Sequence, residues 1–431
     1  MVATPETRDG AVARHTLYNV LGQGLPLLVA LAAVPVLLRG LGEAGFGILA
    51  LVWTLVTLLG EVGVARAGTR FAAAALGAGR PGQVAGIMKV TLRAQLVLGV
   101  VLGGGLAALS PWLAEGVFSV GPELRGDAVT SFTLVALFLP VLALGAGYRG
   151  LLEAAHRFGA LNAIRFVGTT LVYLAPVAAL WAGAPLPWLV ASVLGARGLM
   201  VVAFRVAGRD LTAHADPGDP VPMKEILGFG GWAAVSTVVS PVLVALDRVL
   251  LGARAGVGAV GVYAAPYELA TRVLLVPGAL SATLFPSLSV LDGKGDQEER
   301  ARLARRATGA IALLVAPVML VFVVGADPLV RLWLGAEYAS GAATVLRLLA
   351  PGVLVNALAL VPFTLLQAMG RADLPARFHM VELPLHAALT WVLVGRWGSA
   401  GAAAAWTIRA ALDAALLFGA AALATRARRD A

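Results

Sequence analysis

Residues 128–157 read AVTSFTLVALFLPVLALGAGYRGLLEAAHR, with no Asp, Glu, Lys or Arg before Arg149. A helix of roughly 20 apolar residues crosses the hydrocarbon core of a bilayer, which is about 30 Å thick. Pro140 lies inside this stretch, and membrane helices tolerate an internal proline better than soluble helices do. The stretch therefore predicts a transmembrane helix that ends in the polar sequence LLEAAHR.

The whole chain shares the composition of this segment. Hydrophobic residues make up 59% of its 431 residues and charged residues 13%, against about 45–50% and about 25% in soluble domains. Such a chain cannot cover a globular surface with polar side chains, which argues against a soluble enzyme or a disordered protein. The absence of cysteine excludes disulfides, thiolate zinc sites and cysteine nucleophiles. The composition indicates an integral membrane protein.

Further apolar stretches of similar length precede and follow residues 128–150. The polar N-terminal residues 1–14 lack the apolar core of a signal peptide. We expect an all-α polytopic membrane protein with twelve transmembrane helices, near 17–38, 46–69, 90–110, 128–150, 162–182, 186–206, 229–251, 259–286, 307–325, 344–369, 378–395 and 400–424.

The basic residues predict an orientation for these helices. Of the 33 Lys and Arg residues, 23 lie on the side that carries both termini and seven on the opposite side. An excess of Lys and Arg marks cytoplasmic loops, so both termini should be cytoplasmic. The net charge of +9 thus orients the chain in the membrane, and we expect no nucleic-acid partner.

The sequence LLEAAHR at 151–157 recurs as LLQAMGR at 365–371, 214 residues later. The same offset aligns further pairs: Gly47 and Gly261, Phe71 and Phe285, Gly79 and Gly293, Gln83 and Gln297. Because six spans separate the copies, both halves should have the same topology. We expect two pseudo-symmetric six-helix lobes, 1–206 and 226–431, joined by a cytoplasmic linker at 207–225. Repeats facing one another around a central cavity are typical of alternating-access transporters.

Four motifs carry a resemblance to a known family: LGEAGFG at 41–47, ALDRVLLG at 245–252, LFPSL at 284–288 and RLWLG at 331–335. With them the chain resembles the oligosaccharide (O-antigen-type) flippases, a branch of the multidrug/oligosaccharidyl-lipid/polysaccharide exporter superfamily. The resemblance covers nearly the whole chain. It implies a multi-pass protein of the bacterial cytoplasmic (inner) membrane, with twelve to fourteen spans around a cationic cavity.

The resemblance also implies a function. Such a flippase moves a polyprenyl-diphosphate-linked oligosaccharide from the inner to the outer leaflet for polysaccharide biosynthesis, including that of lipopolysaccharide. We expect a monomer that works with glycan polymerases and glycosyltransferases and is not itself an enzyme. No cofactor is expected, and coupling to a proton or sodium gradient stays open. The sequence contains no P-loop motif for ATP hydrolysis.

Ionisable residues within the predicted spans are the candidate functional residues, because each costs about 2.5–3.5 kcal/mol at a helix centre on insertion scales. For binding the diphosphate we predict cations in the cavity, with Arg272 first, then Arg248, Arg66, Arg70 and Arg197. For ion coupling or charge pairing we predict Asp247, Glu61, Glu268, Arg409 and Asp413. Two i,i+4 pairs can neutralise each other along one helix face: Glu268 with Arg272, and Arg409 with Asp413.

Two alternatives remain open from the sequence. A cation-coupled multidrug exporter of the same superfamily would need an acidic lumen, for which Glu61 and Asp247 are the candidates. The intramembrane charges could also form structural ion pairs alone. The five histidines lack metal-ligand spacing, so no metal site is predicted.

Overall fold

The computed structural model describes residues 5–60, 64–213, 231–293 and 295–427, which are mostly helical and contain no strand. For residues 5–25, 27, 231–241, 282 and 427 only the backbone is described. The chain divides into two compact units, Met1–Ala234 and Val235–Ala431. The predicted linker at 207–225 is described only up to residue 213.

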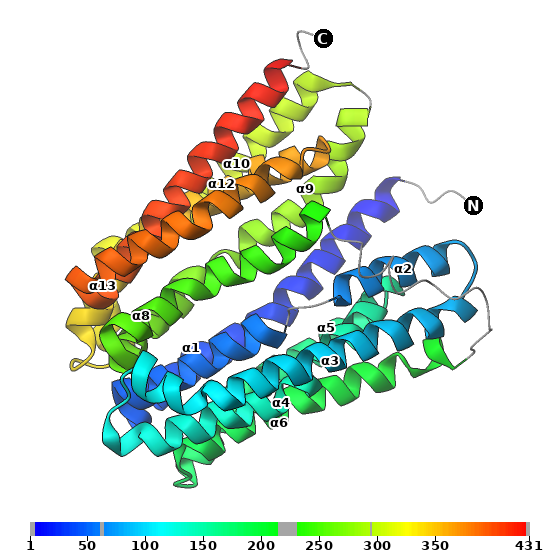
Figure 1. Ribbon diagram of the computed structural model, residues 1–431. Helices are drawn as coiled ribbons and strands as arrows, with labels where there is room; N and C mark the ends of the chain where they lie inside the picture. The colour runs from blue at the N-terminus through cyan, green and yellow to red at the C-terminus, as the bar shows by residue number, and fades with distance from the viewer. Residues whose placement is uncertain (1–4, 61–63, 214–230, 294, 428–431) are drawn as a thin grey trace. The chain divides into compact units, whose positions relative to one another are not determined.

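The N-terminal unit contains long helices with short connections. The π-helical turn η1 (Leu113–Val117) follows α3, and the 3-10 turn η2 (Arg209–Thr212) follows α6. The long helices are α1 (Pro5–Gly60), α2 (Ala65–Gly77), α3 (Gly82–Trp112), α4 (Pro122–Ala154), α5 (Phe158–Trp181) and α6 (Leu186–Ala207) (Figure 1). The first helix thus begins at Pro5, twelve residues before the predicted apolar stretch, because a helix can extend beyond the bilayer core into water.

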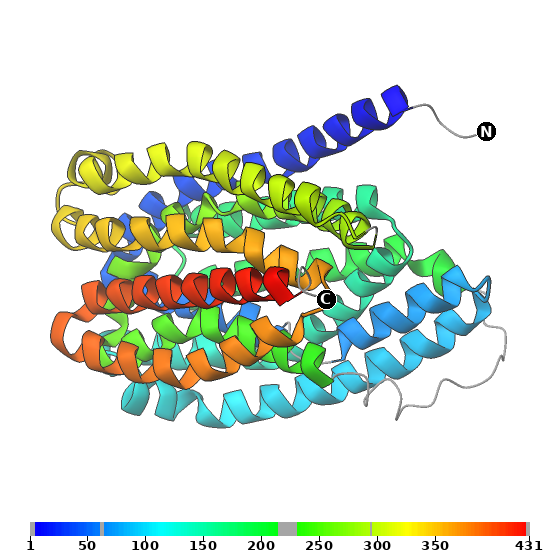
Figure 2. The same ribbon diagram turned by 90° about the horizontal axis from the view of Figure 1, so that it is seen from above.

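The C-terminal unit has the same plan. Its helices are α8 (Gly231–Arg272), α9 (Leu275–Gly293), α10 (Gln297–Val324), α11 (Ala326–Trp333), α12 (Ala339–Ala368) and α13 (Asp373–Ala427). The two arms of α13, orange and red in Figures 1 and 2, lie side by side. The short helix α11 lies between the predicted spans 307–325 and 344–369.

Nine helical segments of the described residues are long and apolar enough to cross a membrane. Three of these are interrupted by a glycine in the left-handed region: Gly42 (φ 68°) in α1, Gly256 (φ 81°) in α8 and Gly398 (φ 53°) in α13. A left-handed residue cannot continue a right-handed helix, so each of these segments consists of two arms. The all-α polytopic fold is confirmed, and the divided segments are compatible with twelve spans.

The backbone repeats the internal pattern of the sequence. The described residues with positive φ form two sets of five, in the same order, 214 to 216 residues apart: Gly42 and Gly256, Gly79 and Gly295, Ser119 and Gly335, His156 and Gly370, Gly183 and Gly398. The heavily buried helices α4 and α12 end at Ala154 and Ala368, again 214 residues apart. The two halves therefore break their helices at equivalent positions.

Helix α3 shows how small residues allow close helix packing. A Cβ atom at Gly99 would lie 2.7 Å from the Cα atom of Pro140 on α4, and one at Gly103 would overlap the Ala136 carbonyl oxygen. Val97, Val100 and Val101 of the same helix are exposed. An apolar face without protein partners suits contact with lipid, whereas the small residues bring the helix backbones together.

Candidate functional site

Glu268 on α8 binds two arginines of the same helix. Its Oε2 atom accepts hydrogen bonds from Arg272 Nε at 3.1 Å and Nη2 at 2.8 Å, as the i,i+4 spacing predicts. Its Oε1 atom lies 3.7 Å from Nη2 of Arg248, which is on the other arm of α8. The break at Gly256 thus brings two predicted substrate-binding arginines to one carboxylate. We call Arg248, Glu268 and Arg272 the arginine cluster.

The arginine cluster carries a formal net charge of +1, because two guanidinium groups share one carboxylate. The side chains of Arg272 and Glu268 are 25% and 24% exposed, and that of Arg248 is 12% exposed. Arg248 also lies over the ring of Tyr267, 4.3 Å from its centroid, in a cation–π contact. The arginine cluster is therefore a partly accessible cationic group with an anchored position.

Asp247 makes structural hydrogen bonds, unlike the adjacent Arg248, which belongs to the arginine cluster. Its Oδ1 atom accepts the backbone N–H of Arg248 at 2.8 Å, and its Oδ2 atom accepts the hydroxyl of Tyr263. Asp247 and Tyr263 are both fully buried. Because both carboxylate oxygens are hydrogen-bonded, Asp247 joins the two arms of α8 and leaves the Arg248 guanidinium to Glu268.

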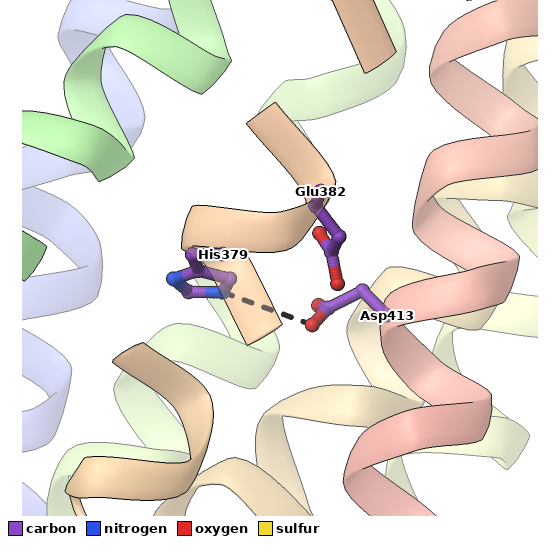
Figure 3. A group of neighbouring side chains, drawn as sticks. All are labelled: His379, Glu382 and Asp413. Carbon is purple, nitrogen blue, oxygen red and sulfur yellow. Dashed lines mark ion pairs between the residues drawn. The ribbon is translucent and has the colours of Figure 1, made fainter. Parts of the chain in front are cut away.

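A second polar group lies between the arms of α13 (Figure 3). His379 and Glu382 come from the first arm and Asp413 from the second, and one ligand atom from each lies within 4.8 Å of the others. The Nε2 atom of His379 is 3.7 Å from Oδ1 of Asp413. We call these three residues the acidic triad. Sequence spacing did not group them, although the His379–Glu382 interval of three residues places both on one helix face.

Arg409 and Asp413 both pair across the arms of α13. Arg409 Nη1 lies 3.7 Å from Oε2 of Glu382, while Asp413 faces His379. The i,i+4 pairing predicted for them considered only contacts along one helix. Since the arms lie side by side, each residue finds its partner on the opposite arm.

Aromatic side chains connect the two polar groups. Tyr267, which stacks on Arg248, makes an edge-to-face contact with Trp406 at 6.1 Å between centroids. Arg409 lies over the same Trp406 ring, 5.8 Å from its centroid. The arginine cluster and the acidic triad thus border one continuous set of side chains within the C-terminal half.

The predicted residues of the N-terminal half are arranged differently. Arg66 and Arg70 are exposed on α2, and Arg70 lies 6.0 Å from the ring centroid of Phe71. Arg197 is half-buried on α6. Glu61 lies outside the described residues. The structure thus gathers Arg248, Arg272, Asp247, Glu268, Arg409 and Asp413 in the C-terminal half.

An ion pair between Arg157 and Asp210 lies at one end of the N-terminal half. Arg157, between α4 and α5, donates hydrogen bonds to both carboxylate oxygens of Asp210 in η2 and to the carbonyl oxygen of Ala207 at 2.7 Å. The guanidinium lowers the pKa of the Asp210 carboxyl below its usual range. This exposed contact joins the ends of α4 and α6.

Membrane-spanning helices, a twofold repeat and buried charges define a polytopic membrane protein of the transporter type. The chain belongs to the polysaccharide biosynthesis protein family, whose sequence profile matches residues 36–343. The predicted resemblance to the oligosaccharide flippases is therefore confirmed at the level of the family.

Individual relatives agree with this assignment. A putative O-antigen transporter of Shigella flexneri is 28% identical over 411 residues, covering 94% of this chain and 97% of that protein. A multidrug resistance transporter of the MATE family, solved facing inward, aligns with a TM-score of 0.82 at 14% identity, over 96% of this chain and 99% of its own. The lipid II flippase MurJ aligns with a TM-score of 0.72 at 12% identity, over 94% and 87%. The two solved structures establish the fold.

Proposed function

We propose that the protein is a flippase that moves a polyprenyl-diphosphate-linked oligosaccharide from the inner to the outer leaflet of the bacterial cytoplasmic membrane. The observation that carries this proposal is the arginine cluster, a net positive, partly exposed group on a helix that spans the membrane. The O-antigen transporter that matches nearly the whole chain supports the same substrate class. The role is transport without catalysis, in polysaccharide biosynthesis.

The arrangement of the arginine cluster suits reversible binding of a diphosphate. Guanidinium groups form paired, charge-assisted hydrogen bonds with phosphate oxygens. In the unloaded protein Glu268 neutralises much of this charge, which avoids the cost of buried, unpaired guanidinium groups. An arriving diphosphate, with its larger negative charge, competes with Glu268 for the arginines. The same carboxylate reclaims them when the headgroup leaves, which keeps the affinity low enough for release.

The remaining features of the mechanism complete this proposal. The lipid tail stays in the bilayer while the headgroup crosses the membrane by alternating access. Both termini lie in the cytoplasm, as the distribution of Lys and Arg predicts. The protein works as a monomer and receives its substrate from glycosyltransferases, and a glycan polymerase uses the product.

Charge reversal at Arg272 tests the proposal. In proteoliposomes with a fluorescent polyprenyl-diphosphate disaccharide, Arg272→Glu should abolish transfer between leaflets, because the substituted carboxylate repels the diphosphate. Arg272→Lys should retain partial transfer. Arg306→Glu, at an exposed position of α10, is the control and should behave like the wild type. Full transfer by a folded Arg272→Glu protein would refute the proposed role of the arginine cluster.

The cation-coupled multidrug exporter is the alternative within the same superfamily. It would require acidic side chains that a cationic drug can reach. Asp247 is fully buried with both oxygens hydrogen-bonded, and Glu382 is 1% exposed. Of the two polar groups described in the C-terminal half, the arginine cluster is the more accessible, and its net positive charge favours an anionic substrate. Drug efflux by the wild-type protein in a sensitive strain, with no glycan transfer, would favour the alternative.

A further inference from the structure

We propose that the acidic triad of His379, Glu382 and Asp413 binds a divalent metal ion of the first transition series. The triad lies on α13, apart from the arginine cluster on α8. It adds a cation site to the C-terminal half.

The geometry of the acidic triad fits ligands around one ion. The separation of 3.7 Å between His379 Nε2 and Asp413 Oδ1 is too long for a hydrogen bond. Two ligand atoms that each lie about 2.1 Å from a metal ion are separated by roughly 3–4 Å. All three ligand atoms lie within 4.8 Å of one another, so small side-chain rotations bring them onto one ion.

The hydrogen bonding of Glu382 is a second, independent indication. This side chain is 1% exposed, and neither of its carboxylate oxygens has a hydrogen-bond partner. The Oδ1 atom of Asp413, which is 6% exposed, also lacks a hydrogen bond. Figure 3 shows both carboxylates and the imidazole pointing toward one another. Burying carboxylates without hydrogen bonds is costly. Arg409, 3.7 Å from Glu382 Oε2, offsets part of this cost, and a metal ion would supply the close contacts that the carboxylate oxygens lack.

The types of ligand indicate the class of ion. One imidazole nitrogen with two carboxylate oxygens suits Mn²⁺, Co²⁺ or Zn²⁺, whereas Mg²⁺ and Ca²⁺ prefer oxygen ligands alone. Two ionised carboxylates and a neutral imidazole carry a charge of −2, which a divalent ion neutralises. Arg409, 3.7 Å from Glu382 Oε2, is placed to contact a ligand carboxylate from outside the coordination sphere.

Metal binding would also change the charge that the substrate meets, an extension that rests on the proposed function. With all carboxylates ionised, the connected side chains comprise four carboxylates and three guanidinium groups, a net charge of −1: Asp247, Glu268, Glu382, Asp413, Arg248, Arg272 and Arg409. A divalent ion raises this net charge to +1. The ion should therefore strengthen binding of an anionic headgroup, and the headgroup should strengthen binding of the ion to the same degree.

Cobalt binding tests the metal site directly. We would titrate the purified, metal-free, full-length protein in nanodiscs with Co²⁺, following its visible absorption bands, and compare Mn²⁺, Zn²⁺, Mg²⁺ and Na⁺ by thermal shift at constant ionic strength. We expect one Co²⁺ per chain. Glu382→Gln, Asp413→Asn and His379→Gln should each weaken binding at least tenfold, the scale on which metal sites respond to altered ligand surroundings. Asp373→Asn, a partly exposed carboxylate of the same helix, should not.

Three outcomes would overturn the metal site. They are no saturable binding of Co²⁺ or Mn²⁺, binding unaffected by all three substitutions, and equal stabilisation by Mg²⁺ or Na⁺. If one carboxyl variant fails to fold, the other two carry the same test. Because the binding assay contains no glycan, its failure leaves the flippase proposal standing.

A second titration tests the coupling, with farnesyl diphosphate as the anionic probe. Mn²⁺ should increase its affinity for the wild-type protein but not for Asp413→Asn, which controls for chelation of the ion by the probe in solution. Equal increases in both proteins would overturn the coupling while leaving the metal site intact.

Discussion

The two halves of this protein share their helix breaks but differ in what they bury. Among the described side chains of the N-terminal half, the buried polar ones are uncharged: Thr54, Thr91, Gln95, Ser110 and Ser131. The C-terminal half buries Asp247, Glu382 and Asp413 within its spans and partly buries three arginines beside them. Among the described residues, both copies of the repeat therefore supply the scaffold, and the second copy carries the buried carboxylates.

The contrast is clear when single buried side chains are compared. Gln95 on α3 accepts the backbone N–H of Val64 at 3.0 Å and donates to the carbonyl oxygen of Ala143 at 3.2 Å, so this amide links three elements. Glu382 is as deeply buried, yet it makes no hydrogen bond through its carboxylate. A neutral amide with its partners stabilises the packing. A carboxylate without them is expensive in the membrane, which points to a function.

The largest effect should come from removing the cationic charges of one half. Arg248→Gln combined with Arg272→Gln should slow glycan transfer about 100-fold or more, because each charged hydrogen-bonding group contributes about 1.5–3 kcal/mol and 1.4 kcal/mol is a factor of ten. Arg66→Gln with Arg70→Gln is the matched pair in the N-terminal half and should slow transfer less than tenfold. The leaflet assay in proteoliposomes measures both. Equal losses would break the comparison between the halves.

A stability effect should distinguish the buried Asp247 from Gln95. Asp247→Ala leaves the fully buried Tyr263 hydroxyl without its acceptor, at about 1–3 kcal/mol, and removes a carboxylate next to Arg248. Gln95→Ala should cost less, because the Val64 N–H that it leaves is only partly buried and the Ala143 carbonyl also belongs to a helical hydrogen-bond ladder. Thermal unfolding of each protein in the same detergent measures the order. If Gln95→Ala proved the more harmful, Asp247 would not be the link between the arms of α8.

A smaller loss of stability, equal in the two halves, is expected when a glycine at a close helix–helix contact is replaced. A Cβ at Gly99 would lie 2.7 Å from Pro140 Cα, and one at Gly352 would lie 2.9 Å from Thr407 Cα. Gly99→Ala and Gly352→Ala should each destabilise by about 1–3 kcal/mol through overpacking. Gly104→Ala, where nothing lies within 4 Å, serves as the control and should be neutral or slightly stabilising. Thermal unfolding in detergent measures these effects. A lower melting temperature for only one of Gly99→Ala and Gly352→Ala would contradict the expected equality.

The smallest effect should come from the exposed contact between Arg157 and Asp210. Arg157 lowers the pKa of Asp210 in the folded protein. The stability that this ion pair contributes is therefore present above the pKa of Asp210 in the unfolded chain and is lost as pH falls through its pKa in the folded protein. Asp210→Asn should therefore lower the melting temperature slightly at pH 7, and this difference should shrink as the pH falls below the usual range of an aspartate carboxyl. A difference that persisted unchanged below that range would show that the ion pair is not its cause.

Hydropathy and loop charge predict much of this fold because each span must be apolar over a fixed length. The repeat was visible in LLEAAHR and LLQAMGR, and the Glu268–Arg272 pair followed from helix spacing. The contacts across the arms of α8 and α13 were not predictable in this way. They depend on Gly256 and Gly398, which bring together residues 16 to 34 positions apart in the sequence.

The left-handed glycine at position 256 has a mechanical consequence. Arg248 and the carboxylate that it faces lie on opposite arms of one hairpin, so any opening of that hairpin separates opposite charges and exposes a bare guanidinium. Bending of α8 at Gly256 therefore also changes the ion pair between Arg248 and Glu268, because a change at this break alters the distance between the two side chains.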